Sequence, residues 1–140
     1  MKIKFKESHA GREKYFKPLF KKDRTNDCSI RAIAHALDKD YMEVMKEIFA
    51  LAIEMVRMPN DDLVVETYMN QLGYKRHKTL TQRNGDTLSL YSVEKFPHKT
   101  GVYLIRVSRH WTCVKEGVLY DTWNCSRKAC RSFYHISGGK

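Results

Sequence analysis

The hydrophobic pattern of this chain changes its period part-way along the sequence, and that change restricts the fold more than any other feature. Apolar residues in 28–37 and 40–58 recur with the 3.6-residue period of an α-helix. From residue 102 onward they alternate with a period of two, which is typical of β-strands. Helices followed by a run of strands predict an α+β fold, in which N-terminal helices pack on a small antiparallel sheet.

Turn and capping residues set the limits of these elements. Asp61 or Asp62 is expected to cap a third helix that runs to about Leu72, where Gly73 ends it. The helix at 40–58 has so few polar residues that we expect it to be the buried core helix. Strands are predicted at 3–5, 102–107, 111–115, 118–120 and 133–136, with turns near residues 11, 83–86 and 117.

Length and composition indicate one folded domain covering residues 1–140. The chain is 42% hydrophobic and 11% aromatic, which is enough for a core of its own. No apolar run approaches the roughly eighteen residues of a membrane span, and the first residues lack the apolar core of a signal peptide. We therefore expect a cytoplasmic protein that does not contact a membrane and whose four cysteines stay reduced.

Basic residues outnumber acidic ones, and they are unevenly distributed. The formal net charge is +10, and residues 1–24 form a basic N-terminal arm with nine lysines or arginines against three acids. Such an arm serves solubility, or it binds an acidic macromolecular partner such as nucleic acid or the acidic face of a protein. No zinc-finger, helix-turn-helix or RNA-recognition signature favours nucleic acid in particular. Both interpretations stay open.

A cysteine lies where a helix is predicted to begin. The run Thr25-Asn26-Asp27-Cys28 supplies turn-forming residues and then a thiol in the first helical turn. The positive end of the helix dipole and its unpaired N–H groups stabilise a thiolate, which is the reactive form of cysteine. The same N–H groups can hold an oxyanion. Cys28 is therefore a candidate nucleophile, although most cysteines without a partner histidine are simply small buried residues.

Two residues of the strand region can complete a set of nucleophile, base and orienting residue. His110 begins one predicted strand and Asp121 follows the next across a tight hairpin, so the carboxylate can reach the imidazole. Bound in this way, Asp121 would fix the tautomer of His110 and stabilise the imidazolium. His35 is a poor partner for Cys28, because seven residues of helix separate the two by about 10 Å.

This order of residues resembles the papain-like cysteine peptidases. Residues 26–32, Asn-Asp-Cys-Ser-Ile-Arg-Ala, are similar to the nucleophile motif of ovarian-tumour-type deubiquitinases. The Asp-Cys pair within them, taken with the hairpin from His110 to Asp121, resembles bacteriocin-leader-type cysteine peptidases. The resemblance covers residues 25–37 and 101–123, and it implies a papain-like fold.

The resemblance also implies roles for individual residues. Cys28 would be the nucleophile, His110 the general base and Asp121 the residue that orients it. Papain-like enzymes usually carry a glutamine several residues before the cysteine, whereas this chain has Lys22 there. We therefore expect Asn26, with backbone N–H groups around Cys28, to form the oxyanion hole. The expected function is a cysteine hydrolase, a peptidase or isopeptidase that cleaves a polypeptide through a thioester, with no cofactor and no metal.

Two other functions stay open at this point. The chain could be a non-catalytic basic binding module with the same fold, which occupies an acidic protein or nucleic-acid partner. Zinc could bind to Cys113, Cys125, Cys130 and His135, although their spacing is looser than that of structural zinc sites. Asn124 and His135 are reserve candidates for the orienting residue and the base.

Several neighbours of these residues are assigned supporting parts. Trp111 and Trp123 flank the expected site, and we expect both to pack in the core, with the wall of a substrate groove as the alternative. Arg31 lies one helical turn beyond Cys28, and we expect it to have a structural role such as an ion pair with Asp27.

Overall fold

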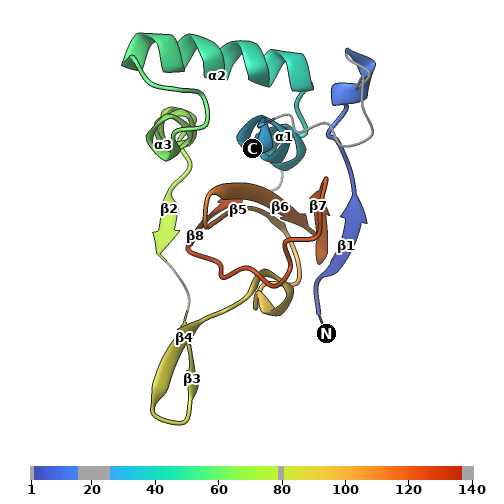
Figure 1. The fold of residues 1–140 in the computed structure, drawn as a ribbon, viewed down its shortest axis with the longest axis vertical. Helices are drawn as coiled ribbons and strands as arrows, with labels where there is room; N and C mark the ends of the chain where they lie inside the picture. The colour runs from blue at the N-terminus through green and yellow to red at the C-terminus, as the bar shows by residue number, and fades with distance from the viewer. Residues whose placement is uncertain (1, 16–25, 79–80, 137–140) are drawn as a thin grey trace.

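A computed structural model describes residues 2–15, 26–78 and 81–136 (Figure 1). These residues form an α+β arrangement, as the sequence pattern predicts, with the three described α-helices on one side of the main sheet. Residues 16–24 of the predicted basic arm, Lys22 among them, lie outside the described residues. No helix in the described part of the chain has both the length and the apolar character needed to cross a membrane.

The helices begin at residues that the sequence marks as caps. They are α1 (Cys28–Leu37), α2 (Tyr41–Met55) and α3 (Asp62–Gln71). The Asp40 side chain accepts a hydrogen bond from the Glu43 N–H at the start of α2, and Asp61 caps α3 by accepting one from the Leu63 N–H. Val56 takes the left-handed conformation, at φ 55°, and ends α2 before the predicted limit at residue 58.

The central helix is α1, and the prediction that 40–58 forms the core helix is wrong. Seven of the ten residues of α1 are buried, whereas α2 lies farther from the sheet, with α1 and α3 between them (Figure 1). In α2, Phe49 and Ile53 expose 44% and 75% of their surface. An outer helix meets its neighbours along one face only, so apolar composition alone does not bury it.

Six strands of the described chain form one sheet, in the order β1-β7-β6-β5-β8-β2. Their bounds are β1 (Lys4–Glu7), β2 (Arg76–Lys78), β5 (Val102–Val107), β6 (His110–Lys115), β7 (Val118–Asp121) and β8 (Ser132–Ile136). The sheet is mixed, which corrects the prediction of an antiparallel one: β1 runs parallel to β7, with Lys4 opposite Val118 and Glu7 opposite Asp121. The three helices lie between these strands in the sequence, and such long connections permit parallel pairing where a tight hairpin does not.

The remaining elements connect or extend this framework. They are the 3-10 helices η1 (Arg12–Lys14) and η2 (Val93–Lys95) and the hairpin of β3 (Thr81–Asn84) and β4 (Thr87–Leu90). The β3–β4 hairpin extends away from the rest of the molecule (Figure 1). Gly117, at φ 78°, makes the tight turn between β6 and β7. That turn brings the two strands carrying His110 and Asp121 side by side.

The sheet has an apolar cluster on each face. Ile33, Trp111 and Cys113 belong to the cluster beneath the helices, and Leu119 and Cys130 belong to the cluster on the opposite face. All four cysteines of the chain are free thiols.

Candidate active site

Cys28 is the first residue of α1. Asp27 is the N-cap, and its carbonyl oxygen accepts a hydrogen bond from the Arg31 N–H at 3.0 Å, which closes the first helical turn. The N–H groups of this turn have no partner within the helix and carry partial positive charge. The Cys28 residue is partly exposed, so a reagent can reach it. The local sequence therefore places a thiol where its anion is favoured.

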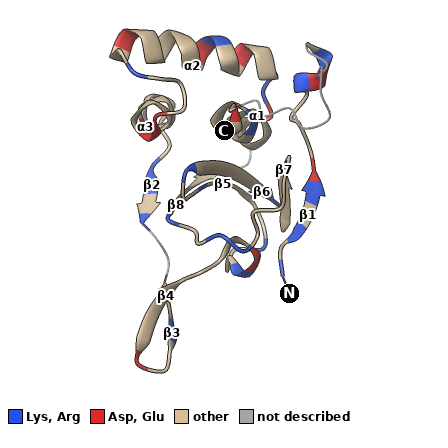
Figure 2. Cartoon of the chain, viewed as in Figure 1, with Lys and Arg blue, Asp and Glu red and all other residues tan. Residues whose placement is uncertain are grey.

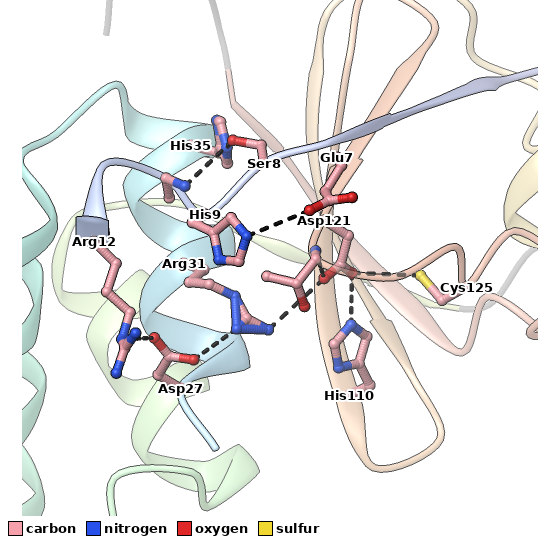
Figure 3. A network of polar contacts seen from close by, with 12 residues as sticks. Glu7, Ser8, His9, Arg12, Asp27, Arg31, His35, His110, Asp121 and Cys125 are labelled. Atoms are coloured by element: carbon pink, nitrogen blue, oxygen red, sulfur yellow. Dashed lines mark hydrogen bonds and ion pairs between the residues drawn. The ribbon is translucent and has the colours of Figure 1, made fainter. Parts of the chain in front are cut away.

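His110 and Asp121 form a buried pair on adjacent antiparallel strands. His110 begins β6 and Asp121 ends β7, and Nε2 of the histidine lies 2.6 Å from Oδ2 of the aspartate (Figure 3). In the ladder Cys113 lies opposite Tyr120, so the following aspartate comes close to the start of β6. The two side chains expose only 9% and 3% of their surface. The expected hairpin geometry between His110 and Asp121 is present.

Three further groups surround the Asp121 carboxylate. Its Oδ1 accepts a hydrogen bond from the Thr122 N–H at 2.7 Å and lies 3.7 Å from Nη2 of Arg31. Its Oδ2 accepts a hydrogen bond from the Cys125 thiol at 3.5 Å (Figure 3). Burial by itself would raise the pKa of Asp121, but the hydrogen bond from His110 and the charge of that residue lower it. The carboxylate therefore stays ionised and is fixed in direction.

His110 is held in its protonated form. Burial by itself would lower the pKa of His110, but hydrogen bonds with Asp121, Cys125 and Cys28 outweigh that effect and raise it well above its ordinary value. The Cys28 thiol and the Asp121 carboxylate are thus both among the groups that raise the pKa of the imidazole. An imidazolium beside a thiol favours the thiolate. Cys28 and His110 can therefore form an ion pair, and the Asp121 carboxylate stabilises the imidazolium of that pair.

An open cleft of about 800 Å³ gives access to these groups. Cys28 and His110 both line it, and Asp121 lies behind the histidine. The wall also includes Arg109, which precedes His110 in the β5–β6 turn and has a positive φ of 57°. Asn60 also lines the cleft. The cleft is large enough for several residues of an extended peptide, which is the scale of a ligand site rather than of a packing defect.

The two tryptophans differ in their environment. Trp111 is 2% exposed and packs in the helix-side cluster, as expected, and its Nε1 donates a hydrogen bond to Asp62 at 2.9 Å. Trp123 is 43% exposed and its ring lies 4.9 Å from that of His110, so the prediction that it packs in the core is wrong. Both residues line the cleft. Trp123 follows β7 in an exposed turn, where an apolar ring can cover the histidine without being enclosed.

Asn26, the expected contributor to the oxyanion hole, also lines the cleft. Its backbone is left-handed, at φ 52°, and its carbonyl oxygen accepts a hydrogen bond from the Asn60 side chain at 2.5 Å. This contact ties the turn before α1 to the segment before α3. The residue is exposed, and its part in an oxyanion hole stays a prediction.

The residues suggested for zinc do not meet. Cys113 lies in the cluster beneath the helices, whereas Cys125 and Cys130 lie in the cluster on the opposite face of the sheet. His135 is exposed and stacks on Tyr103, with ring centroids 4.8 Å apart. The main sheet therefore separates Cys113 from Cys125 and Cys130.

Another set of three residues brings together nitrogen, oxygen and sulfur atoms of the kinds that bind metal ions. In the described part of the chain, atoms of His110, Asp121 and Cys125 lie within 4.8 Å of one another and all three residues are buried. Two of them already form a hydrogen bond of 2.6 Å, which a metal ion would have to replace. The side chain of the reserve candidate Asn124 accepts a hydrogen bond from the Ser126 N–H.

Some residues of this network could not be found from the sequence. The spacing of four residues between Asp27 and Arg31 predicts their ion pair, which the structure confirms at 2.6 Å. The second contact of Arg31, with Asp121, joins a helix to a distant strand and leaves no local signal in the sequence. The contact of Arg12 with Asp27, at 3.4 Å, is equally non-local. Searches of protein-family models, curated proteins and solved structures gave no match to this chain.

Proposed function

We propose that this chain is a papain-like cysteine hydrolase, a peptidase or isopeptidase that cleaves a polypeptide. The observation that carries the proposal is the buried 2.6 Å bond between His110 and Asp121, beside Cys28 in an open cleft. A partly exposed thiol at a helix start, an imidazolium and a fixed carboxylate are the parts of a thiol nucleophile with its base and orienting residue. No cofactor is needed for this chemistry.

In the proposed reaction Cys28 begins as a thiolate and His110 as an imidazolium. The sulfur attacks the carbonyl carbon of the scissile amide, and the carbonyl oxygen becomes an anion stabilised by Asn26 and the N–H groups at the start of α1. His110 gives its proton to the nitrogen as the C–N bond breaks, which leaves a thioester and a free amine. His110 then takes a proton from water, whose oxygen attacks the thioester and releases a carboxylic acid and the Cys28 sulfur.

Selective alkylation of the thiols tests the proposal without a known substrate. A short pulse of iodoacetamide near pH 6, followed by peptide mapping, should label Cys28 much faster than Cys113 and Cys130. Burial raises the pKa of each of these two thiols to about 12, so they serve as internal controls. The variant His110→Ala should label Cys28 more slowly than the unaltered protein does. Equal labelling of all the thiols in the unaltered protein would contradict the proposal.

Hydrolysis itself can be measured on a defined mixture of synthetic peptides by mass spectrometry. Cys28→Ala should abolish cleavage and leave the fold intact, His110→Ala should lose almost as much activity, and Asp121→Ala should lose less. Cleavage that survives in Cys28→Ala would exclude Cys28 as the nucleophile.

The exposed basic side chains of β1 favour a second candidate function, a binding module for an acidic partner. Lys4 and Lys6 are exposed at the edge of the sheet (Figure 2), and none of the ion pairs found in the described residues involves them. The double variant Lys4→Glu/Lys6→Glu should weaken salt-dependent binding to polyglutamate, whereas Cys28→Ala should leave it unchanged. If the protein does not bind polyglutamate at physiological salt, this candidate fails.

A further inference from the structure

One largely buried guanidinium at the wall of the cleft contacts two buried carboxylates. Arg31 donates from Nη1 to Oδ1 of Asp27 at 2.6 Å, and its Nη2 lies 3.7 Å from Oδ1 of Asp121 (Figure 3). The exposed fractions of the Arg31, Asp27 and Asp121 side chains are 9%, 6% and 3%. A planar guanidinium offers several donors in fixed directions, so it can hold two carboxylates in a set relation to each other.

The two carboxylates belong to the two halves of the proposed active site. Asp27 is the residue immediately before Cys28 and occupies the N-cap position of its helix. Asp121 ends β7 and holds His110. We infer that Arg31 is a positioning residue for the proposed hydrolase: by holding Asp27 and Asp121 together, it fixes the thiol-bearing helix start against the His110–Asp121 pair. This inference rests on the proposed function.

Charge balance alone does not account for this arrangement. Asp27 also accepts a hydrogen bond from the Tyr41 hydroxyl at 2.6 Å and has Arg12 at 3.4 Å, so it is stabilised without Arg31. Asp121 faces the protonated His110 and the Thr122 N–H. Each carboxylate thus has other partners that stabilise its charge. Arg31 adds a connection between α1 and β7, because it contacts both carboxylates.

The charge of Arg31 also acts on the reacting groups. In the described part of the chain, the titratable and charged groups near Arg31 and its two carboxylates include Arg12 of η1, Asp27 and Cys28 at the start of α1, Tyr41 of α2, His110 of β6, and Asp121 with Cys125 at and after β7. The buried positive charge of Arg31 lies 3.7 Å from Asp121, the partner of His110, so it bears on the charge of that pair. Removing it should therefore change the pH profile of Cys28 alkylation, which a role in packing alone would not do.

The test compares Arg31→Met and Arg31→Lys with a matched control, Arg76→Met, in the full-length protein. Arg76 lies on β2, at the edge of the sheet away from β7, and is half exposed. The rate of Cys28 alkylation by iodoacetamide is measured from pH 4 to pH 9. Arg31→Met should raise the midpoint by about one pH unit and so slow alkylation near pH 6 about tenfold. Arg31→Lys keeps the charge and should keep the midpoint, as should Arg76→Met.

Proton NMR supplies a second readout, because the proton in the 2.6 Å bond between His110 and Asp121 should give a strongly deshielded resonance. Lysine has a single ammonium in place of the planar fork, so in Arg31→Lys this resonance should shift and exchange faster with water. An Arg31→Met variant that is folded and keeps the unaltered alkylation profile would overturn the inference. If that variant does not fold, an unchanged resonance in Arg31→Lys overturns it instead. Failure of the proposed function is distinct, because Cys28 of the unaltered protein would then show no selective alkylation.

Discussion

Replacing Asp121 by asparagine removes one charge from the buried pair and leaves the volume of the side chain almost unchanged. The asparagine oxygen can still accept the Thr122 N–H, which lies 2.7 Å from Oδ1 in the native protein. The attraction to the protonated His110, at 2.6 Å, is lost. Removing one partner of a buried ion pair lowers the free energy of unfolding by about 3–5 kcal/mol. Because the hydrogen bond with the Thr122 N–H is retained, we expect a value at the lower end of this range. We expect a loss of about 3 kcal/mol at pH 5.5.

The loss should become smaller as the pH rises. His110 has a raised pKa in the folded protein, so its stabilising effect is complete below the pKa of an unfolded histidine and declines as the pH rises toward the folded value. In Asp121→Asn the carboxylate no longer offsets the effect of burial on the pKa of His110, so the folded variant holds a neutral His110. Its stability therefore lacks the decline that His110 causes in the unaltered protein as the pH rises. Between about pH 6.5 and 8.5 the difference between the two proteins should fall by up to about 1.4 kcal/mol per pH unit.

Urea unfolding followed by tryptophan fluorescence measures this difference. With a slope of about 1–3 kcal/mol per molar urea, the midpoint of Asp121→Asn should be lower by about 1–3 M at pH 5.5 and by much less at pH 8.5. Asp86→Asn is the matched control, because Asp86 is exposed in the turn between β3 and β4. A destabilisation by Asp121→Asn that stays constant or grows with pH would refute the charged pair.

Three further predictions concern stability, measured by urea unfolding at pH 7. Leu104→Ala should lower the free energy of unfolding by about 2–5 kcal/mol because Leu104 is fully buried. Its control, Leu88→Ala, should change it by less than about 0.5 kcal/mol because Leu88 is 61% exposed. Equal effects of the two variants would contradict the described core. Val56→Gly should stabilise the protein by about 1 kcal/mol, because a β-branched residue occupies a left-handed position at the end of α2 and is 89% exposed. Tyr41→Phe should lose about 1–2 kcal/mol with its hydrogen bond to Asp27, and an unchanged midpoint would show that this bond is not formed.

The sequence predicts those parts of the fold that local chemistry determines. Asp27 and the thiol after it mark the start of α1, and the apolar period carries that helix to Leu37, as observed. Gly117 marks the β6–β7 turn, and with it the proximity of His110 to Asp121. In each case the signal and the structure it specifies lie within about a dozen residues.

The features that the sequence did not reveal depend on distant contacts. The exposure of α2 follows from its place outside α1 and α3, which its apolar composition does not record. Trp123 looks like a core residue by its type, but its position after β7 leaves it at the cleft. The parallel partner of β1 could not be chosen from residues 4–7, because several strands present a similar apolar pattern.

The parallel pairing of β1 with β7 has a consequence for how the protein is made. β1 and α1 leave the ribosome early, whereas β6 and β7 are synthesised last among the strands that build the cleft. Until Asp121 has emerged, Lys4 to Glu7 have no partner on β7, and the His110–Asp121 pair cannot form beside Cys28. Pairings between segments so far apart in the sequence form slowly. A nascent chain that has not yet extended past Asp121 would therefore carry a Cys28 thiol without the His110–Asp121 pair, and the proposed hydrolase would become active only after β7 is made.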